Sequence, residues 1–228
     1  MDTIVTADVL WTWGALFGLG VFHGVNPGMG WLFAVALGLQ EQRGRAVARA
    51  MLPLALGHAA AIGVAVLAAA LAGQAIPQDV LQRVVGIALL SLGAYRVWRC
   101  RHPRWGGMTV GARDLAVWSF LMASAHGAGL MVVPLVIGMG SASATPLPNP
   151  HAHHTIAAAE GPQADALLHA LTATTIHGLG YLVVTAAIAW VVYRYLGVGL
   201  LRKAWVNLDL VWAAALATTG AVALSLAG

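Results

Sequence analysis

The stretch VFHGVNPGMGW, residues 21–31, lies in the middle of the first long apolar run of the chain. It places a histidine, an asparagine, a proline and three glycines where a membrane-spanning helix is normally most uniformly apolar. Proline interrupts the hydrogen bonding of a helix, and ionisable residues in hydrocarbon are costly unless they face a partner, a cavity or a ligand. The stretch therefore predicts either a broken membrane helix that carries part of a functional site or a plain proline kink with small residues for helix packing.

The composition predicts an integral membrane protein. Of the 228 residues, 60% are hydrophobic and 9% are charged, and the mean hydropathy is +0.79, whereas soluble domains are about 45–50% apolar. At about 20 residues per span, roughly six helices fit, and little chain is left for a soluble domain. We expect an all-α integral membrane bundle of six transmembrane helices in contact with membrane lipid. The single cysteine, Cys100, excludes an internal disulfide and a metal centre built from paired cysteines.

The apolar runs predict helices at about 10–40, 45–73, 80–99, 115–140, 166–197 and 204–227. Of the twelve Lys and Arg residues, all but Arg83 fall in or beside the loops after the first, third and fifth helices. Because loops rich in Lys and Arg stay in the cytoplasm, we expect these loops inside and both termini outside. Basic residues distributed in this way indicate membrane topology, so no nucleic-acid partner is expected.

The two halves of the chain are similar to each other. FHGVNPGMGW aligns with AHGAGLMVVP, ALGHAAAIGVAV with TTIHGLGYLVVT and, more weakly, LSLGAYRV with LATTGAVA. These alignments pair His23 with His126 and His58 with His177. Because each half has three helices, an odd number, the second copy must be inverted in the membrane, as in many secondary transporters. We predict inverted three-helix repeats at 1–105 and 106–228, with a His-containing outer loop at about 141–165.

The four paired histidines lie near the centres of their predicted helices and therefore near one plane of the bilayer. Neutral imidazole is a good ligand for Ni, Co, Zn and Cu ions, whereas Mg and Ca prefer oxygen ligands. The predicted metal site consists of His23, His58, His126 and His177, and the expected ligand is a divalent transition-metal ion. In the alternative interpretation, each histidine only donates a hydrogen bond to a neighbouring helix and thereby joins the bundle.

Three further residues are candidates for ligands or substrate contacts at this site. In a continuous helix, Asn26 lies on the same face as His23, and Pro27 has no N–H for the His23 carbonyl, which is left free. Met29 is either a thioether ligand or a core residue. Asp209, near the cytoplasmic end of the last predicted helix, either caps the helix, pairs with an arginine or Lys203, or acts in proton exchange.

The outer loop carries a second group of histidines in the run HAHH, followed by one more histidine where the fifth helix is expected to begin. Short His-rich tracts can capture metal ions. The candidates for outer capture are His151, His153, His154 and His169. The alternative is that this tract is only a solvated linker.

LGVFHGVNPGMGWLFAVALGL, followed by LALGHAAAIGVAV, resembles the NicO-type nickel/cobalt efflux transporters of bacteria, in the wider LysE-like superfamily. That family has a His-Gly-x-Glu-Pro-Gly-His motif in its first helix, a Ser-His in its second, a His-rich loop and six helices. His23, Pro27, Gly28 and His58 match. Asn26 and Met29 replace the Glu and the second His, and His126 and His177 are additions. The resemblance implies a multi-pass protein of the bacterial inner membrane that handles a divalent metal.

The leading functional hypothesis is a transporter that moves a transition-metal ion, or a small metal-containing solute, through the four-His site. A metalloenzyme that holds a catalytic metal with the same histidines is the alternative. It is less favoured because no Glu or second Asp lies at the expected midplane to act as acid or base. A haem-binding electron carrier is less favoured still, because haems that conduct across a bilayer occupy separate depths.

Overall fold

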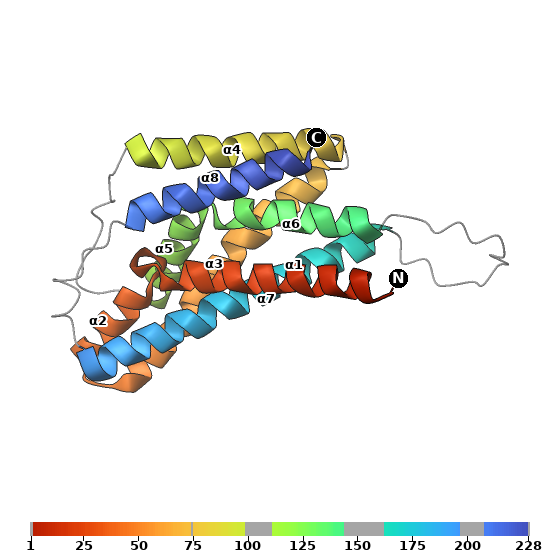
Figure 1. Cartoon of the computed structure of the whole chain (residues 1–228). Coiled ribbons are helices and arrows are strands. Elements are labelled where there is room, and N and C mark those ends of the chain that lie inside the picture. Colours follow the sequence, from red (N-terminus) through yellow and green to blue (C-terminus); the bar gives the residue numbers. More distant parts are fainter. Residues whose placement is uncertain (1, 74, 99–110, 144–161, 197–207, 228) are drawn as a thin grey trace, which may run out of the picture.

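The computed structural model describes residues 2–73, 75–98, 111–143, 162–196 and 208–227. All regular secondary structure in these ranges is helical, which confirms the all-α prediction (Figure 1). The helices are α1 (Asp2–Val25), the 3-10 helix η1 (Pro27–Met29), α2 (Trp31–Glu41), α3 (Gly44–Ala72), α4 (Gln78–Trp98), α5 (Ala112–Ala125), α6 (Ala128–Ser143), α7 (Pro162–Val191), the π-helix η2 (Val192–Leu196) and α8 (Leu208–Leu226).

The observed helices follow the predicted ranges closely. The first predicted helix corresponds to α1 and α2, and the fourth to α5 and α6, each pair separated by a short break. The first helix begins at Asp2, earlier than the predicted start at residue 10. The polar and glycine-containing segments in the two apolar runs thus mark real interruptions of the backbone helix.

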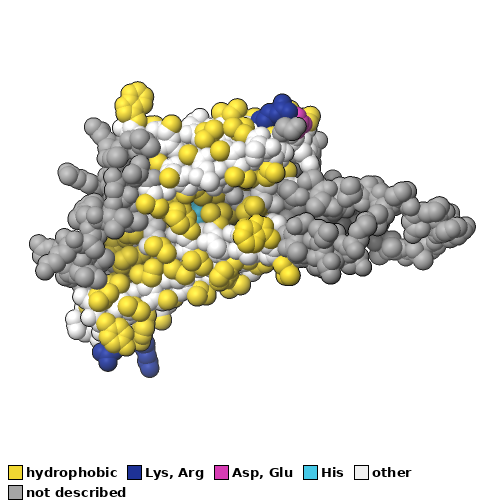
Figure 2. All heavy atoms as spheres, viewed as in Figure 1, with side chains coloured by type: hydrophobic (Ala, Val, Ile, Leu, Met, Phe, Trp, Pro, Cys, Tyr) yellow, Lys and Arg dark blue, Asp and Glu magenta, His cyan; other side chains and the backbone are white. Residues whose placement is uncertain are grey.

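Two helical segments in the described residues are long and apolar enough to cross a membrane: Gly44–Ala72 and Leu167–Leu196. The pair α5 and α6, bent by 61° at its break, passes the same test as a unit. Figure 2 shows hydrophobic side chains over the middle of the molecule and basic side chains near its ends. Leu52, for example, is 66% exposed on α3. Such outward apolar faces are typical of helices surrounded by lipid.

The helices pack in three main pairs: α1 with α7, α3 with α5, and α4 with α8, while α3 also contacts α7 in the centre. Glycines allow the backbones to approach. A Cβ added at Gly20 would overlap the carbonyl of His177, and one added at Gly57 would overlap the carbonyl of Ala116. Close approach through small residues is the usual packing mode of membrane helices.

The first break is built by Asn26. Its backbone is extended (φ −68°, ψ 121°) and its Oδ1 accepts the Gly28 N–H at 2.8 Å, so the side chain caps η1. Gly30, with φ 121°, turns the chain into α2. The expectation of a free His23 carbonyl is wrong, because this carbonyl accepts the Asn26 N–H at 3.2 Å. In a continuous α-helix, the Asn26 N–H would bond to the carbonyl four residues earlier. Because α1 ends at Val25, this N–H bonds to the His23 carbonyl instead.

The second break coincides with the other His-Gly pair. His126 follows the last residue of α5, and Gly127 has a φ of 70°, a conformation that glycine adopts without a Cβ penalty. α6 then begins at Ala128. In both halves of the chain, therefore, the histidine of the His-Gly pair lies within a few residues of a helix break.

Candidate functional site

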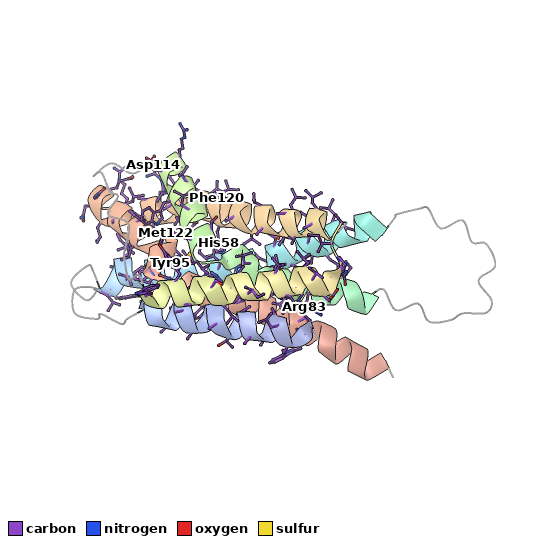
Figure 3. All side chains as sticks on the ribbon, turned by 90° about the horizontal axis from the view of Figure 1, so that it is seen from above. His58, Arg83, Tyr95, Asp114, Phe120 and Met122 are labelled. Atoms are coloured by element: carbon purple, nitrogen blue, oxygen red, sulfur yellow. The ribbon has the colours of Figure 1, made fainter. Side chains whose placement is uncertain are left out.

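Three buried imidazoles meet in the centre of the bundle. They are His23 from α1, His58 from α3 and His177 from α7, and each is 0% exposed. Their ring centroids are 5.0, 5.4 and 5.8 Å apart. Figure 3 shows His58 along the bundle between Arg83 on one side and Tyr95 and Asp114 on the other. We refer to these three residues as the His cluster.

The closest contact in the His cluster joins two imidazole nitrogens. Nε2 of His58 lies 3.2 Å from Nε2 of His177, and the two rings are parallel within 6°. A hydrogen bond between two imidazoles requires one nitrogen to carry a hydrogen and the other to accept it. The two residues therefore adopt complementary tautomers in this state.

The remaining nitrogens of the His cluster show an uncommon lack of partners. Nδ1 of His23 lies 2.8 Å from the Leu19 carbonyl, which can only accept, so Nδ1 carries the hydrogen and Nε2 carries the lone pair. His23 Nε2 and His58 Nδ1 are buried and have no hydrogen-bond partner in the described part of the chain, and His177 Nδ1 makes no well-formed hydrogen bond there, although His177 lies near the backbone of Leu16. Buried polar atoms without partners are rare in native proteins, and they indicate a place for an ion, a water molecule or a ligand.

Aromatic side chains enclose the His cluster. The ring of Tyr181 stacks on His58 with 3.9 Å between centroids, and the Tyr181 hydroxyl donates to the Met29 carbonyl at 2.8 Å. On another side, Trp212 from α8 packs edge-on against His23, with 4.7 Å between centroids. Tyr181 is 0% and Trp212 1% exposed. The site is thus lined by aromatic ring surfaces, and the buried side chains of Ser119 and Thr185 lie beside the Tyr181 hydroxyl.

His126 is buried next to the His cluster, and Trp212 packs against it as well as against His23. The centroid distance from His126 to Trp212 is 5.2 Å. Its Nδ1 lies 2.8 Å from the Met122 carbonyl, four residues earlier, which repeats the contact of His23 with Leu19. The structure thus joins three of the four predicted ligands directly and connects the fourth to them through Trp212.

The other predicted contacts have structural roles or lie apart. Asn26 uses its side-chain oxygen to cap η1, and Met29 is 0% exposed within the hydrophobic core, so it fills the core. Asp209 lies in the first turn of α8. His169 is half-buried in α7, two turns before His177. The HAHH tract falls outside the described residues, so its predicted role stays a prediction.

Sequence reasoning missed the two aromatic residues of the site. Tyr181 lies four positions after His177, so both residues face the same side of α7, and this spacing could have identified Tyr181. Trp212 has no comparable pattern in the sequence, because the packing of α8 against α4 and α6 decides where it lies.

The four histidines predicted as metal ligands do not surround one point in this structure. As placed, no three His, Cys, Asp or Glu side chains among the described residues form a group that could hold a metal ion. No protein-family model matches the chain, and no curated protein or solved structure is significantly similar to it. The resemblance to nickel/cobalt efflux transporters therefore stays a prediction based on its motif residues. The geometry of the His cluster remains the basis for a functional assignment.

Proposed function

We propose that the protein is a polytopic membrane transporter that moves a transition-metal ion through the His cluster. The observation that carries this proposal is the group of three fully buried imidazoles, in which His23 Nε2 has no hydrogen-bond partner and the Nε2 atoms of His58 and His177 meet at 3.2 Å. A lone buried histidine satisfies itself by donating to a carbonyl, as His23 does with one nitrogen. Hydrogen bonding between helices does not require three adjacent imidazoles, some of whose nitrogens are left without partners. Neutral imidazole favours Ni, Co, Zn and Cu ions.

Ring spacing supports metal binding. A tetrahedral ion with metal–nitrogen bonds of about 2.05 Å holds its ligand nitrogens about 3.3 Å apart and its imidazole centres about 5.2 Å apart. The His58 and His177 Nε2 atoms are 3.2 Å apart, and the three ring-centre distances range from 5.0 to 5.8 Å. Binding of one ion by all three residues would require the side chains to reorient so that their Nε2 atoms face a shared point. An ion there would replace the hydrogen bond between His58 and His177.

We assign the fourth coordination position to His126. This residue and His23 pack against the same Trp212 ring, so a displacement of Trp212 would open the way between them. A site that gains one ligand when a side chain moves has two states of different affinity. A transporter needs such states to take up an ion and to release it.

The packing supports the proposed inverted repeats, which alternate access across a membrane would use. In the proposed repeats, α1 corresponds to α5, α3 to α7 and α4 to α8. The packed pair α1 and α7 therefore corresponds to the packed pair α5 and α3, and the packed pair α4 and α8 corresponds to itself. Both broken helices also correspond under this exchange. Transporters with inverted repeats commonly place broken helices around a central site. We therefore retain six spans in two repeats as the proposed architecture.

The distribution of arginines supports an orientation with both termini outside the cytoplasm of a bacterial cell. Arg43 and Arg45 lie at the start of α3, Arg113 at the start of α5 and Arg194 near the end of η2. These helix ends lie at the end of the bundle opposite both termini (Figure 1). Arg83 lies toward the other end (Figure 3). By the positive-inside rule, the arginine-rich end faces the cytoplasm of an inner-membrane protein.

The proposal can be tested with Co²⁺ as a spectroscopic probe. The background variant carries His151→Ala, His153→Ala and His154→Ala, which removes the three histidines of the HAHH run. We expect this protein to bind one Co²⁺ with the intense visible bands of tetrahedral coordination, and addition of His58→Ala and His177→Ala should abolish them. His169→Ala is the matched control, because it removes a histidine of α7 outside the His cluster.

Transport is tested with the same variants in proteoliposomes loaded with a metal-sensitive dye. Flux of Co²⁺, Zn²⁺ or Ni²⁺ that disappears with His58→Ala and His177→Ala but persists with His169→Ala would support the transporter. If the background variant binds none of these ions, the metal site is contradicted. If it binds them but no ion crosses the membrane, metal binding stands and transport is contradicted.

A further inference from the structure

A pocket lined by arginines lies at the start of α3, far from the His cluster. It is lined by Arg43, Arg45, Ala48 and Arg49, and we call it the Arg43 pocket. Figure 2 shows basic side chains at the lower left corner of the molecule, where α3 begins and α7 ends in Figure 1. The small side chain of Ala48 leaves space between the guanidinium groups. The pocket therefore presents several hydrogen-bond donors to a ligand from outside.

Positive charge in the Arg43 pocket is only partly neutralised. Arg49 forms an ion pair with Glu41. The described residues provide no ion pair for Arg43 or Arg45. Arg45 and Arg49 are four positions apart on one helix, where like charges repel each other. An anion in the pocket would remove this repulsion, and guanidinium groups bind phosphate oxygens with paired hydrogen bonds.

The helix face that begins in the pocket changes from cationic to apolar. Arg45, Arg49, Leu52 and Leu56 are spaced four, three and four residues apart, so they share one face of α3. Leu52 is 66% and Leu56 59% exposed. A ligand lying along this face meets guanidinium groups first and exposed leucines about two turns later. This order matches an amphiphile with an anionic head and an apolar chain.

Aromatic residues from the end of α7 and from η2 border the start of this face. Trp190 and Tyr193 pack beside Gly44, where an added Cβ would contact both rings. Trp190 is 50% exposed. Tryptophan and tyrosine are enriched where membrane helices leave the hydrocarbon. Moreover, α3 and the Leu167–Leu196 segment are the two described segments long and apolar enough to span the bilayer individually, and the pocket lies where the two ends meet.

We propose that the Arg43 pocket binds the phosphodiester headgroup of an anionic phospholipid, with an acyl chain along Leu52 and Leu56. This goes beyond the proposed function, because the ligand is a lipid and the residues are separate from the His cluster. Arg43 and Arg45 bind the phosphate, Arg49 is shared between Glu41 and the headgroup, and Trp190 borders the interfacial region of the lipid.

Native mass spectrometry of the full chain, in detergent with added phosphatidylglycerol or phosphatidylcholine, tests the site. We expect phosphatidylglycerol to be retained preferentially, and Arg43→Gln/Arg45→Gln should weaken its retention by about tenfold or more. Ala48→Phe should weaken it as well, because it fills the pocket and keeps every charge. Arg83→Gln/Arg113→Gln removes the same charge from positions that do not line the pocket, and it should retain the lipid.

Three results would overturn the lipid site. The first is equal retention of the two lipids by the wild-type protein. The second is equal weakening by the pocket variants and the Arg83/Arg113 control, which would indicate general surface charge. The third concerns soluble glycerophosphoglycerol, the headgroup without acyl chains. If it displaces the bound lipid at the same concentration as phosphatidylglycerol does, the pocket binds free phosphoesters rather than a lipid. Unchanged melting temperatures in phosphatidylcholine show that the variants fold.

Discussion

Nε2 of His58 lies 3.2 Å from Nε2 of His177, although 119 positions separate the two residues. The sequence alignment of the two halves pairs these same residues. The contact therefore joins corresponding positions of the proposed repeats, and it lies where α3 and α7 pack against each other. A pair of equivalent residues that meet in this way lies close to the axis that would relate the two repeats.

The structure predicts that the four histidines contribute unequally to metal binding. In the background lacking the HAHH histidines, we expect His58→Ala and His177→Ala each to weaken Co²⁺ affinity by more than about 100-fold. Loss of even an outer-shell partner costs about 10–100-fold in metal affinity. His126→Ala should weaken it by about 10–100-fold, less than loss of His58 or His177, because His126 can reach the ion only after Trp212 is displaced. Titration followed by visible absorption measures these affinities. A larger effect of His126→Ala than of His177→Ala would contradict this ranking.

Packing between α1 and α7 predicts different effects for two neighbouring glycines. A Cβ at Gly20 would overlap the backbone carbonyl of His177, whereas a Cβ at Gly18 has no atom within 4 Å. Gly20→Ala should lower the free energy of unfolding by about 1–3 kcal/mol, the usual cost of overpacking. Gly18→Ala should leave it unchanged or raise it by up to about 1 kcal/mol, because alanine favours the helix. Denaturant titration in detergent compares them, and equal stabilities would contradict the close approach.

Much of this fold follows from local patterns in the sequence. The apolar runs predicted the helices, and the polar residues and glycines in VFHGVNPGMGW predicted the first break. Three of the four histidines predicted as ligands, all from the middle of long helical runs, meet in the structure. Local patterns of this kind depend on periodicity and composition, which the sequence displays directly.

The parts that escaped prediction depend on contacts between distant elements. The proposed role of Asn26 assumed a continuous helix, but α1 ends at Val25 and the side chain caps η1 instead. The separation of His126 from the His cluster depends on Trp212, and the position of Trp212 depends on how α8 packs against α6. Such packing is decided by the fit of whole helix surfaces, for which a single sequence contains no local pattern.

The Asn26 cap should be measurable as stability. Asn26→Ala removes the acceptor for the Gly28 N–H, and loss of a capping side chain costs about 1 kcal/mol. Asn26→Ser should recover most of this loss, since serine also caps helices well. Denaturant titration in detergent provides both values. If Asn26→Ala leaves stability unchanged while it lowers Co²⁺ affinity strongly, Asn26 acts as a ligand rather than as a cap.

Tyr181 connects the His cluster to the first break, and substitution can separate its two contacts. Tyr181→Phe keeps the ring that stacks on His58 but leaves the buried Met29 carbonyl without the hydroxyl hydrogen. An unsatisfied buried carbonyl costs about 1–3 kcal/mol, so the free energy of unfolding should fall by that amount. Because the stacked ring remains, Co²⁺ affinity should change by less than about threefold.

Tyr181→Leu removes the stacked ring as well, so it should reduce Co²⁺ affinity further than Tyr181→Phe while the stability loss is at least as large. The comparison distinguishes orientation of His58 by the aromatic ring from a purely structural role. If both variants lose stability equally and bind Co²⁺ with wild-type affinity, Tyr181 serves only to hold η1 against α7. If Tyr181→Phe is already enough to abolish Co²⁺ binding, the hydroxyl is itself part of the site, because the phenyl ring would still stack on His58.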